Sequence, residues 1–190
     1  MKLFTIFLFL TSTCLFSQND YSATKEFPFG KLNPNAPKEV ADFQELIGTC
    51  NCKSESKKQD GTWAEPIDMT WTFKYIMNGM AVQDETIKAD GSHSGSIRQF
   101  DVKNNTWNVF YYTTKATPRK LPVWTGNRNA NKIVLYKEQK APNGTDGFYR
   151  LTFSNISTKG FNWVGEWVDK NEKIVFPTWK ISCIKQQYFF

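Results

Sequence analysis

The segment IDMTWTFKYIMNG, residues 67–79, decides the fold class because its side chains alternate between apolar and polar along most of its length. Its apolar positions are Ile67, Met69, Trp71, Phe73 and Tyr75. Successive side chains of a strand point to opposite faces, so this pattern predicts a strand with one buried and one wet face. Asn78-Gly79 is typical of a tight hairpin turn. The segment therefore predicts an antiparallel sheet.

The same alternation recurs along the rest of the chain, interrupted by polar turn clusters such as NRNAN and APNGTDG. Further strands are expected at about 46–54, 80–88, 96–103, 106–114, 121–127, 132–140, 147–155, 160–169 and 173–185. About ten short strands linked by hairpins close into a barrel or fold as a sandwich. The sequence shows no repeat and no internal boundary, so one all-β domain is expected over residues 37–187.

A short amphipathic helix is predicted before the first strand, in PKEVADFQELIG, residues 37–48. Pro37 suits a first helical turn, and Val40, Phe43 and Ile47 recur at spacings of three and four. The preceding residues, 18–36, are polar and contain several Pro and Gly residues. They predict an irregular leader along the surface.

The first residues, MKLFTIFLFLTSTCLFSQ, have the pattern of a secretory signal peptide, residues 1–17, cleaved near Ser17. Cleavage there discards Cys14; a lipid anchor on Cys14 is the less favoured alternative. The apolar run is too short to span a membrane, and no later segment is longer. An exported, periplasmic or secreted protein without a membrane span is expected.

The charge pattern argues against nucleic acid as a partner. Removal of residues 1–17 takes away Lys2 and no acid, so the net charge of +6 becomes +5. The basic residues are scattered, with acids between many of them, and no basic helix gathers them. This pattern is typical of a solvated surface.

Two further stretches resemble a known family. They are IRQFDVKNNTW, residues 97–107, and FNWVGEWVDKNEKIVFPTW, residues 161–179; Gly48-Thr49 opening a strand after a helix adds to the likeness. Over about residues 38–185 the chain resembles lipocalin-like (calycin) barrels, and among them an uncharacterised bacterial family of exported proteins. The resemblance implies a closed antiparallel up-and-down β-barrel. Cys50 stands where the calycin pattern has Trp.

The three cysteines outside the signal peptide, Cys50, Cys52 and Cys183, are expected to staple the barrel. In an up-and-down barrel the first strand pairs with the last. If Gly48 lies opposite Lys185, then Cys50 lies opposite Cys183, so a Cys50–Cys183 disulfide is favoured over Cys52–Cys183. Three thiols and the lone His93 give no recognisable zinc spacing, and no metal or other cofactor is expected; a redox role or an intermolecular bridge is the alternative to the staple.

The aromatic residues give the main functional hypothesis. If these residues take the inward-facing positions of their strands, the barrel interior is lined by Trp71, Phe73, Tyr75, Trp107, Tyr111, Trp163, Trp167 and Trp179. Arg98, Arg150 and Glu166 are added as polar site residues, with Glu166 expected to accept from Arg98 or Arg150. A barrel of this size holds one small ligand or a filled core. A small apolar or amphipathic ligand bound without chemistry is the favoured hypothesis.

Three other functions stay open. A filled core would make the protein a structural or partner-binding one. An enzyme would need a base, but His93 lies in a Gly/Ser turn, and neighbours such as Asp84-Glu85 point to opposite faces of a strand; no catalytic residue is assigned. An outer-membrane barrel is disfavoured because Asp68, Thr70, Thr72 and Lys74 would face lipid.

Overall fold

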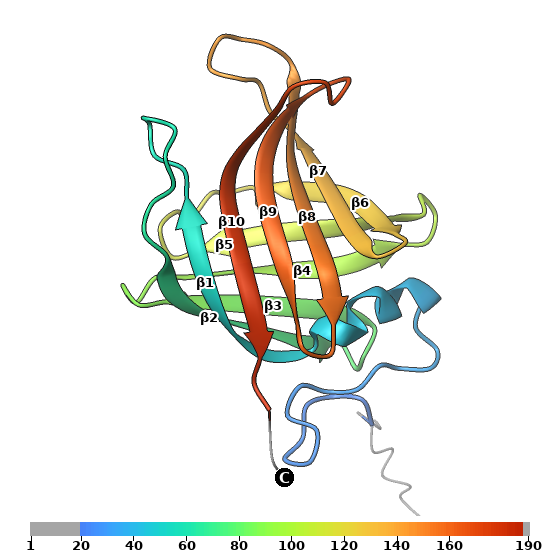
Figure 1. Cartoon of the computed structure of the whole chain (residues 1–190). Coiled ribbons are helices and arrows are strands. Elements are labelled where there is room, and N and C mark those ends of the chain that lie inside the picture. Colours follow the sequence, from blue (N-terminus) through green and yellow to red (C-terminus); the bar gives the residue numbers. More distant parts are fainter. Residues whose placement is uncertain (1–19, 188–190) are drawn as a thin grey trace, which may run out of the picture.

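The computed structural model describes residues 20–187, which form a closed antiparallel barrel of ten strands preceded by one short helix (Figure 1). The elements are η1 (Lys38–Leu46), β1 (Gly48–Ser56), β2 (Ile67–Ile76), β3 (Ala81–Lys88), β4 (His93–Asp101), β5 (Thr106–Thr113), β6 (Val123–Asn129), β7 (Lys132–Glu138), β8 (Gly147–Ser157), β9 (Gly160–Asp169) and β10 (Val175–Lys185). Each strand pairs with the next, and β1 pairs with β10. The predicted all-β up-and-down barrel is confirmed. The predicted signal peptide, residues 1–17, lies outside the described residues.

The alternation predicted in residues 67–79 is present from Met69 to Tyr75, but Ile67, at the start of β2, is 46% exposed instead of buried. Met69, Trp71, Phe73 and Tyr75 are buried inside the barrel, and Asn78 and Gly79 turn the chain into β3 with φ values of 53° and 79°. A Cβ on Gly79 would lie 2.4 Å from the Lys31 carbonyl oxygen, so only glycine fits this crowded turn.

The helix closes one end of the barrel, which we call the floor. It is a 3-10 helix, and its Val40 and Phe43 side chains are completely buried. The Phe43 ring packs edge-on against Trp107, with ring centroids 4.9 Å apart, and Trp107 Nε1 donates to Asp42 at 3.0 Å. Burial raises the pKa of Asp42, and the hydrogen bond from Trp107 opposes that shift. We call the opposite end of the barrel the mouth. The inward-facing residues of each strand lie between the floor and the mouth.

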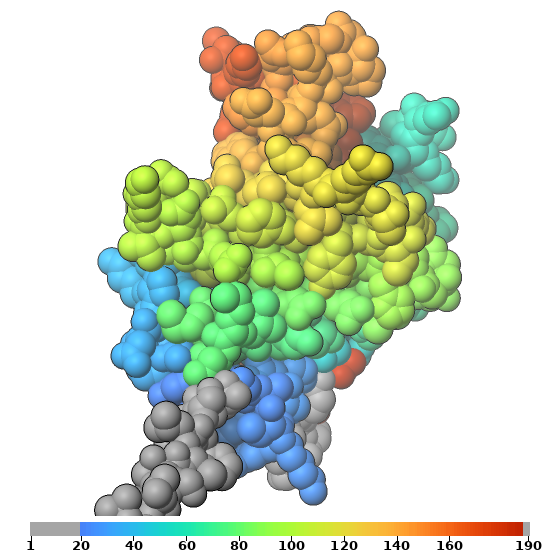
Figure 2. Space-filling view, turned by 180° about the vertical axis from the view of Figure 1, so that it is seen from behind, coloured from blue at the N-terminus to red at the C-terminus, as the bar shows by residue number. Residues whose placement is uncertain are grey.

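The leader lies along the β2–β3 hairpin (Figure 2). The Tyr75 N–H donates to the Phe29 carbonyl at 2.8 Å, and the Asn33 N–H donates to the Gly79 carbonyl at 3.2 Å. The Asn33 side chain also donates to the Asn78 carbonyl at 3.0 Å. These bonds fix the irregular segment to the outside of the barrel near the floor.

Among the described residues, the structure contains no helix of the length and hydropathy that a membrane crossing requires.

The seam between β1 and β10 corrects the predicted disulfide. The disulfide joins Cys52 and Cys183, with the Cα atoms 4.1 Å apart, and Cys50 is a buried free thiol. The predicted Cys50–Cys183 pairing is wrong because Cys50, not Gly48, lies opposite Lys185. A shift of two residues keeps every side chain on its predicted face, so the alternation could not distinguish the two registers.

Candidate ligand cavity

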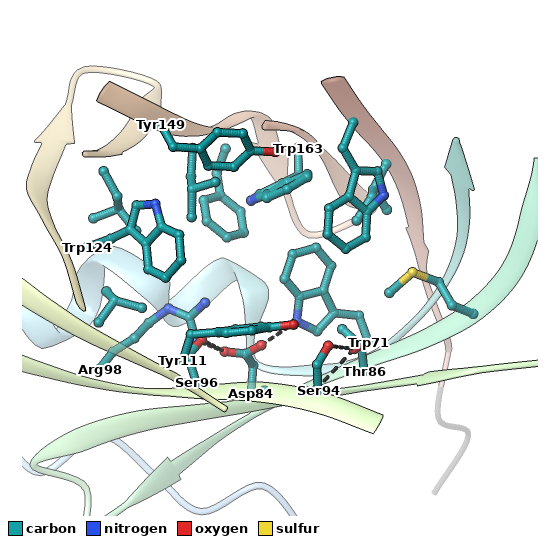
Figure 3. Close-up of a pocket in the computed structure, with 18 residues that line it drawn as sticks. Trp71, Asp84, Thr86, Ser94, Ser96, Arg98, Tyr111, Trp124, Tyr149 and Trp163 are labelled. Carbon is teal, nitrogen blue, oxygen red and sulfur yellow. Dashed lines mark hydrogen bonds and ion pairs between the residues drawn. The ribbon is translucent and has the colours of Figure 1, made fainter. Parts of the chain in front are cut away.

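An internal cavity of about 200 Å³ lies between the floor and the mouth (Figure 3). Its apolar lining includes Met69, Trp71, Val109, Tyr111, Trp124, Leu135, Leu151, Phe153, Trp163, Trp179 and Ile181. Its polar lining consists mainly of Asp84, Thr86, Ser94, Ser96 and Arg98, which come from β3 and β4. Figure 3 shows this polar wall facing the rings of Trp124, Tyr149 and Trp163. The cavity is therefore amphipathic, with one hydrogen-bonding side.

Asp84 organises the polar wall. It is 3% exposed and accepts hydrogen bonds from Trp71 Nε1 at 2.7 Å and from Ser96 Oγ at 2.5 Å. It also forms an ion pair with Arg98, which is 2% exposed. A buried charge needs such partners, because its loss of hydration is otherwise uncompensated. Asp84 and Arg98 thus contribute no net charge to the cavity.

The remaining polar groups leave donors without acceptors. Thr86 Oγ1 and Ser94 Oγ lie 2.7 Å apart and satisfy one another. Within the part of the chain that the structure describes, Trp124 Nε1 and Arg98 Nε are buried without a hydrogen-bond partner. The Arg98 guanidinium lies over the rings of Phe43 and Phe73, each about 5.1 Å away, which partly compensates its burial. The Trp124 indole N–H has no such compensation.

Two lysines occupy inward positions at the mouth. Lys88 Nζ lies 4.6 Å from the ring centre of Trp179, and Lys137 Nζ lies 4.6 Å from that of Trp124. Burial lowers the pKa of both amines, and Lys115 lowers that of Lys88 further. The mouth is therefore cationic and continuous with the aromatic wall.

The structure brings five of the predicted site residues to the cavity and separates the other six from it. Trp71, Arg98, Tyr111, Trp163 and Trp179 line the cavity. Phe73, Tyr75 and Trp107 are buried in the core at the floor. Burial raises the pKa of Tyr75 to about 12. Trp167 does not line the cavity, and its Nε1 donates to the Gln139 carbonyl at 2.9 Å.

Arg150 and Glu166 point away from the cavity and form a largely buried structural ion pair, in which Glu166 is 8% exposed. Arg150 Nη2 is 2.9 Å from Glu166 Oε1, and Arg150 also pairs with Glu172. Glu166 thus accepts from Arg150, and Arg98 pairs with Asp84 instead. The two strands align these residues directly, because Arg150 is opposite Glu166 in the β8–β9 register.

Sequence reasoning missed most of the polar wall. Asp84, Thr86, Ser94, Ser96 and Trp124 were not among the expected site residues. The signal was present in β3, where Val82, Asp84 and Thr86 share one face and Val82 is apolar. An isolated acid in an inward position is a reason to expect a buried partner, which is Arg98 here.

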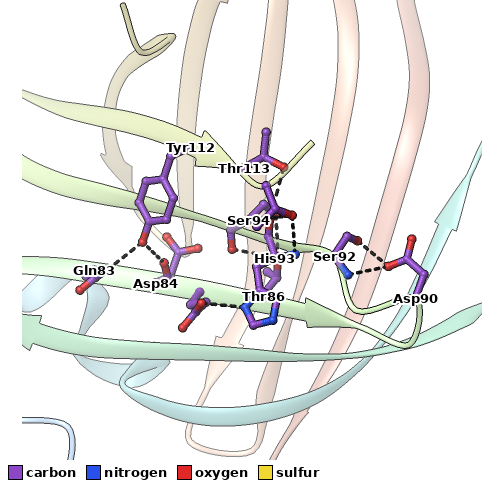
Figure 4. Close-up of polar contacts among 11 residues, drawn as sticks. Gln83, Asp84, Thr86, Asp90, Ser92, His93, Ser94, Tyr112 and Thr113 are labelled. Carbon is purple, nitrogen blue, oxygen red and sulfur yellow. Dashed lines mark hydrogen bonds and ion pairs between the residues drawn. The ribbon is translucent and has the colours of Figure 1, made fainter. Parts of the chain in front are cut away.

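His93 lies away from the cavity. Its Nδ1 is 2.9 Å from Glu85 Oε1, and both side chains are substantially exposed. Figure 4 shows this hairpin, with Ser92 Oγ donating to Asp90 at 2.5 Å in the turn. In the described part of the chain, no three His, Cys, Asp or Glu residues are grouped to hold a metal ion. His93 is therefore not placed to act as a base on a molecule in the cavity.

The fold and cavity define a class: closed ten-stranded antiparallel barrels with an internal cavity plugged by an N-terminal helix. No protein-family model matches the chain, and no curated protein matches it. Among solved structures, the chain is similar to the crystal structure of Rv2717c from M. tuberculosis, at 10% sequence identity and a TM-score of 0.51. The match covers 80% of this chain and 100% of that one. At this identity the likeness supports the fold alone, and the lipocalin-like (calycin) family stays a prediction.

Proposed function

We propose that this protein is an exported, non-catalytic barrel that binds a small apolar or amphipathic molecule in its interior. The observation that carries the proposal is the cavity, in which a polar wall faces an aromatic wall that includes Trp124, whose buried Nε1 donor has no partner among the described residues. Concave apolar cavities with a few polar groups are the usual sites for small molecules. A ligand with a hydrogen-bond acceptor would satisfy this donor.

The lining explains why large aromatic residues leave the interior unfilled. Small side chains occupy one wall at cavity height, namely Thr86, Ser94 and Ser96. These small residues support a binding cavity over the alternative of a filled core with a purely structural or partner-binding role.

Binding can be tested with the fluorescent apolar probe N-phenyl-1-naphthylamine. The substitution Leu151→Trp adds a large side chain to the cavity wall, and the neighbouring Thr152→Trp adds the same side chain at the next, outward position of β8. We expect the wild type and T152W to enhance probe fluorescence with saturation, and L151W to lose most of this enhancement. Equal binding by L151W, or no binding by the wild type, would contradict the proposal.

Export is supported by the predicted signal peptide and is compatible with the Cys52–Cys183 disulfide, because disulfides persist in oxidising compartments. The test is mass spectrometry of the native protein purified from its own host. We expect a mature chain that begins near Gln18 and a mass two hydrogens lower than that of the reduced form. A retained small molecule would identify the ligand directly, and an intact N-terminus would contradict export by this signal.

A further inference from the structure

The two lysines at the mouth bear on the charge of the ligand. Neither Lys88 nor Lys137 forms an ion pair with any carboxylate in residues 20–187, and both stand in register with inward residues, Lys88 opposite Met69 and Lys137 opposite Tyr149. Each ammonium group instead lies over the ring of a cavity tryptophan. Two half-buried cations therefore lie beside two different tryptophans, Trp179 and Trp124, that line one apolar cavity.

Neighbouring acids do not neutralise these two lysines. Asp90 attracts Lys88, but the ion pair of Asp90 is with Lys115 at 3.2 Å, and Lys115 repels Lys88. Glu85 points outward and pairs with His93. No charged group contributes to the lowered pKa of Lys137, which has burial as its cause. The mouth thus has a positive charge that an anion can satisfy.

The interior of the cavity, in contrast to the mouth, disfavours an anion. The Asp84 carboxylate is already paired with Arg98 and accepts from Trp71 and Ser96, so a second anion in the cavity would meet a buried carboxylate and no free cation. Burying an unpaired charge in such a lining is strongly unfavourable. An anionic group is therefore favoured at the mouth and disfavoured in the interior.

We propose that the ligand is an amphipathic anion, bound with its charged end at the mouth, where Lys88 and Lys137 lie, and its apolar body among the cavity tryptophans. This inference rests on the proposed function and specifies its ligand class and orientation. The anionic group is a carboxylate or a group of similar charge. The ligand is a free molecule, as opposed to a membrane surface.

The test compares two ligands with the same chain, decanoate and 1-decanol, as competitors of N-phenyl-1-naphthylamine. The variants are Lys88→Met and Lys137→Met, which keep an unbranched side chain and remove the charge. The control is Lys74→Met, an exposed lysine in β2 whose neighbours in sequence are the buried Phe73 and Tyr75. We expect wild type and K74M to bind decanoate more tightly than 1-decanol. Each mouth variant should weaken decanoate about tenfold and leave 1-decanol unchanged.

The outcomes separate this inference from the proposed function. If the probe binds but decanoate and 1-decanol compete equally, or if the mouth variants leave decanoate unchanged, the orientation proposed here is wrong and the binding barrel stands. If the probe itself does not bind, both fail. Phosphatidylglycerol vesicles provide a further arm: co-sedimentation that depends on Lys88 and Lys137 would assign these lysines to a membrane surface and overturn the proposal.

Discussion

At the scale of single residues, the pair of Asp84 and Arg98 is the most consequential polar feature. Both side chains are almost completely buried, and Asp84 also accepts from Trp71 and Ser96. A buried ion pair adds little net stability relative to apolar residues of the same shape, but removal of one partner leaves a buried charge uncompensated. The pair therefore makes the polar wall sensitive to single substitutions.

We expect Asp84→Ala to lower the free energy of unfolding by about 3–5 kcal/mol, because Arg98 would remain charged and buried. The measurement is urea unfolding followed by tryptophan fluorescence. The matched control is Glu85→Ala on the outer face, for which a change within about 0.5 kcal/mol is expected. In the double variant with Arg98→Met, the loss should be smaller than the sum of the single losses; additive losses would show that the two groups do not interact.

Lys137 gives a prediction for pH dependence. Burial lowers its pKa below the ordinary 10.5, so at pH values between the folded and unfolded pKa the unfolded chain binds more protons. The unfavourable contribution of Lys137 is therefore present at neutral pH and disappears as the pH rises towards 10.5. The free energy of unfolding of the wild type relative to K137M should rise between pH 8 and pH 10.5 in urea titrations. A constant difference would contradict a buried ammonium.

At the scale of structural elements, the seam between β1 and β10 closes the barrel. The Cys52–Cys183 bond spans a sequence separation of 131 residues and holds the first and last strands together. A crosslink between distant residues stabilises mainly by restricting the unfolded chain. The free Cys50 lies beside it, and burial raises the pKa of its thiol, against an opposing effect of Lys185.

Replacing both Cys52 and Cys183 by alanine should lower the free energy of unfolding by about 2–4 kcal/mol. The same loss is expected when the wild type is unfolded in urea with a reductant. Cys50→Ala serves as the control, because it leaves the bond intact. Iodoacetamide in denaturant without reductant should label Cys50 and neither partner of the disulfide; a labelled Cys52 would mean that the pairing is different.

The elements also show how far the sequence determines the structure. Periodicity placed the ten strands to within a few residues, because inward positions such as Trp71 and Trp163 must leave water. It did not fix the β1–β10 register, since a shift by two residues preserves every face. Periodicity also could not tell which inward residues lie at the floor and which line the cavity. Trp107 and Trp179 both face inward, and only the helix that packs against Trp107 distinguishes them.

At the scale of the whole molecule, the leader and the barrel are the two parts that the sequence predicted, as residues 18–36 and residues 37–187. The leader adds hydrogen bonds to the β2–β3 hairpin through Phe29 and Asn33, and Leu32 packs against the core. Within residues 20–36, the described part of the leader, no residue lines the cavity. The barrel should therefore fold and bind without it.

We expect the chain from 37 to 187 to keep the circular dichroism spectrum of the chain from 18 to 187. Its free energy of unfolding should be lower by about 1–3 kcal/mol, because a few hydrogen bonds and their packing are lost. Probe binding should be unchanged. Loss of the folded spectrum would show that the domain boundary at residue 37 is wrong.

The covalent seam has a mechanical consequence. If the molecule is pulled by its two ends, the force passes along Cys52–Cys183 and bypasses the strands from β2 to β9. Only the segments outside the bond can extend, so a single-molecule tether should stretch by a short length and then resist up to the rupture of a covalent bond. Reduction would convert the same tether into one that lengthens by the whole loop between the two cysteines.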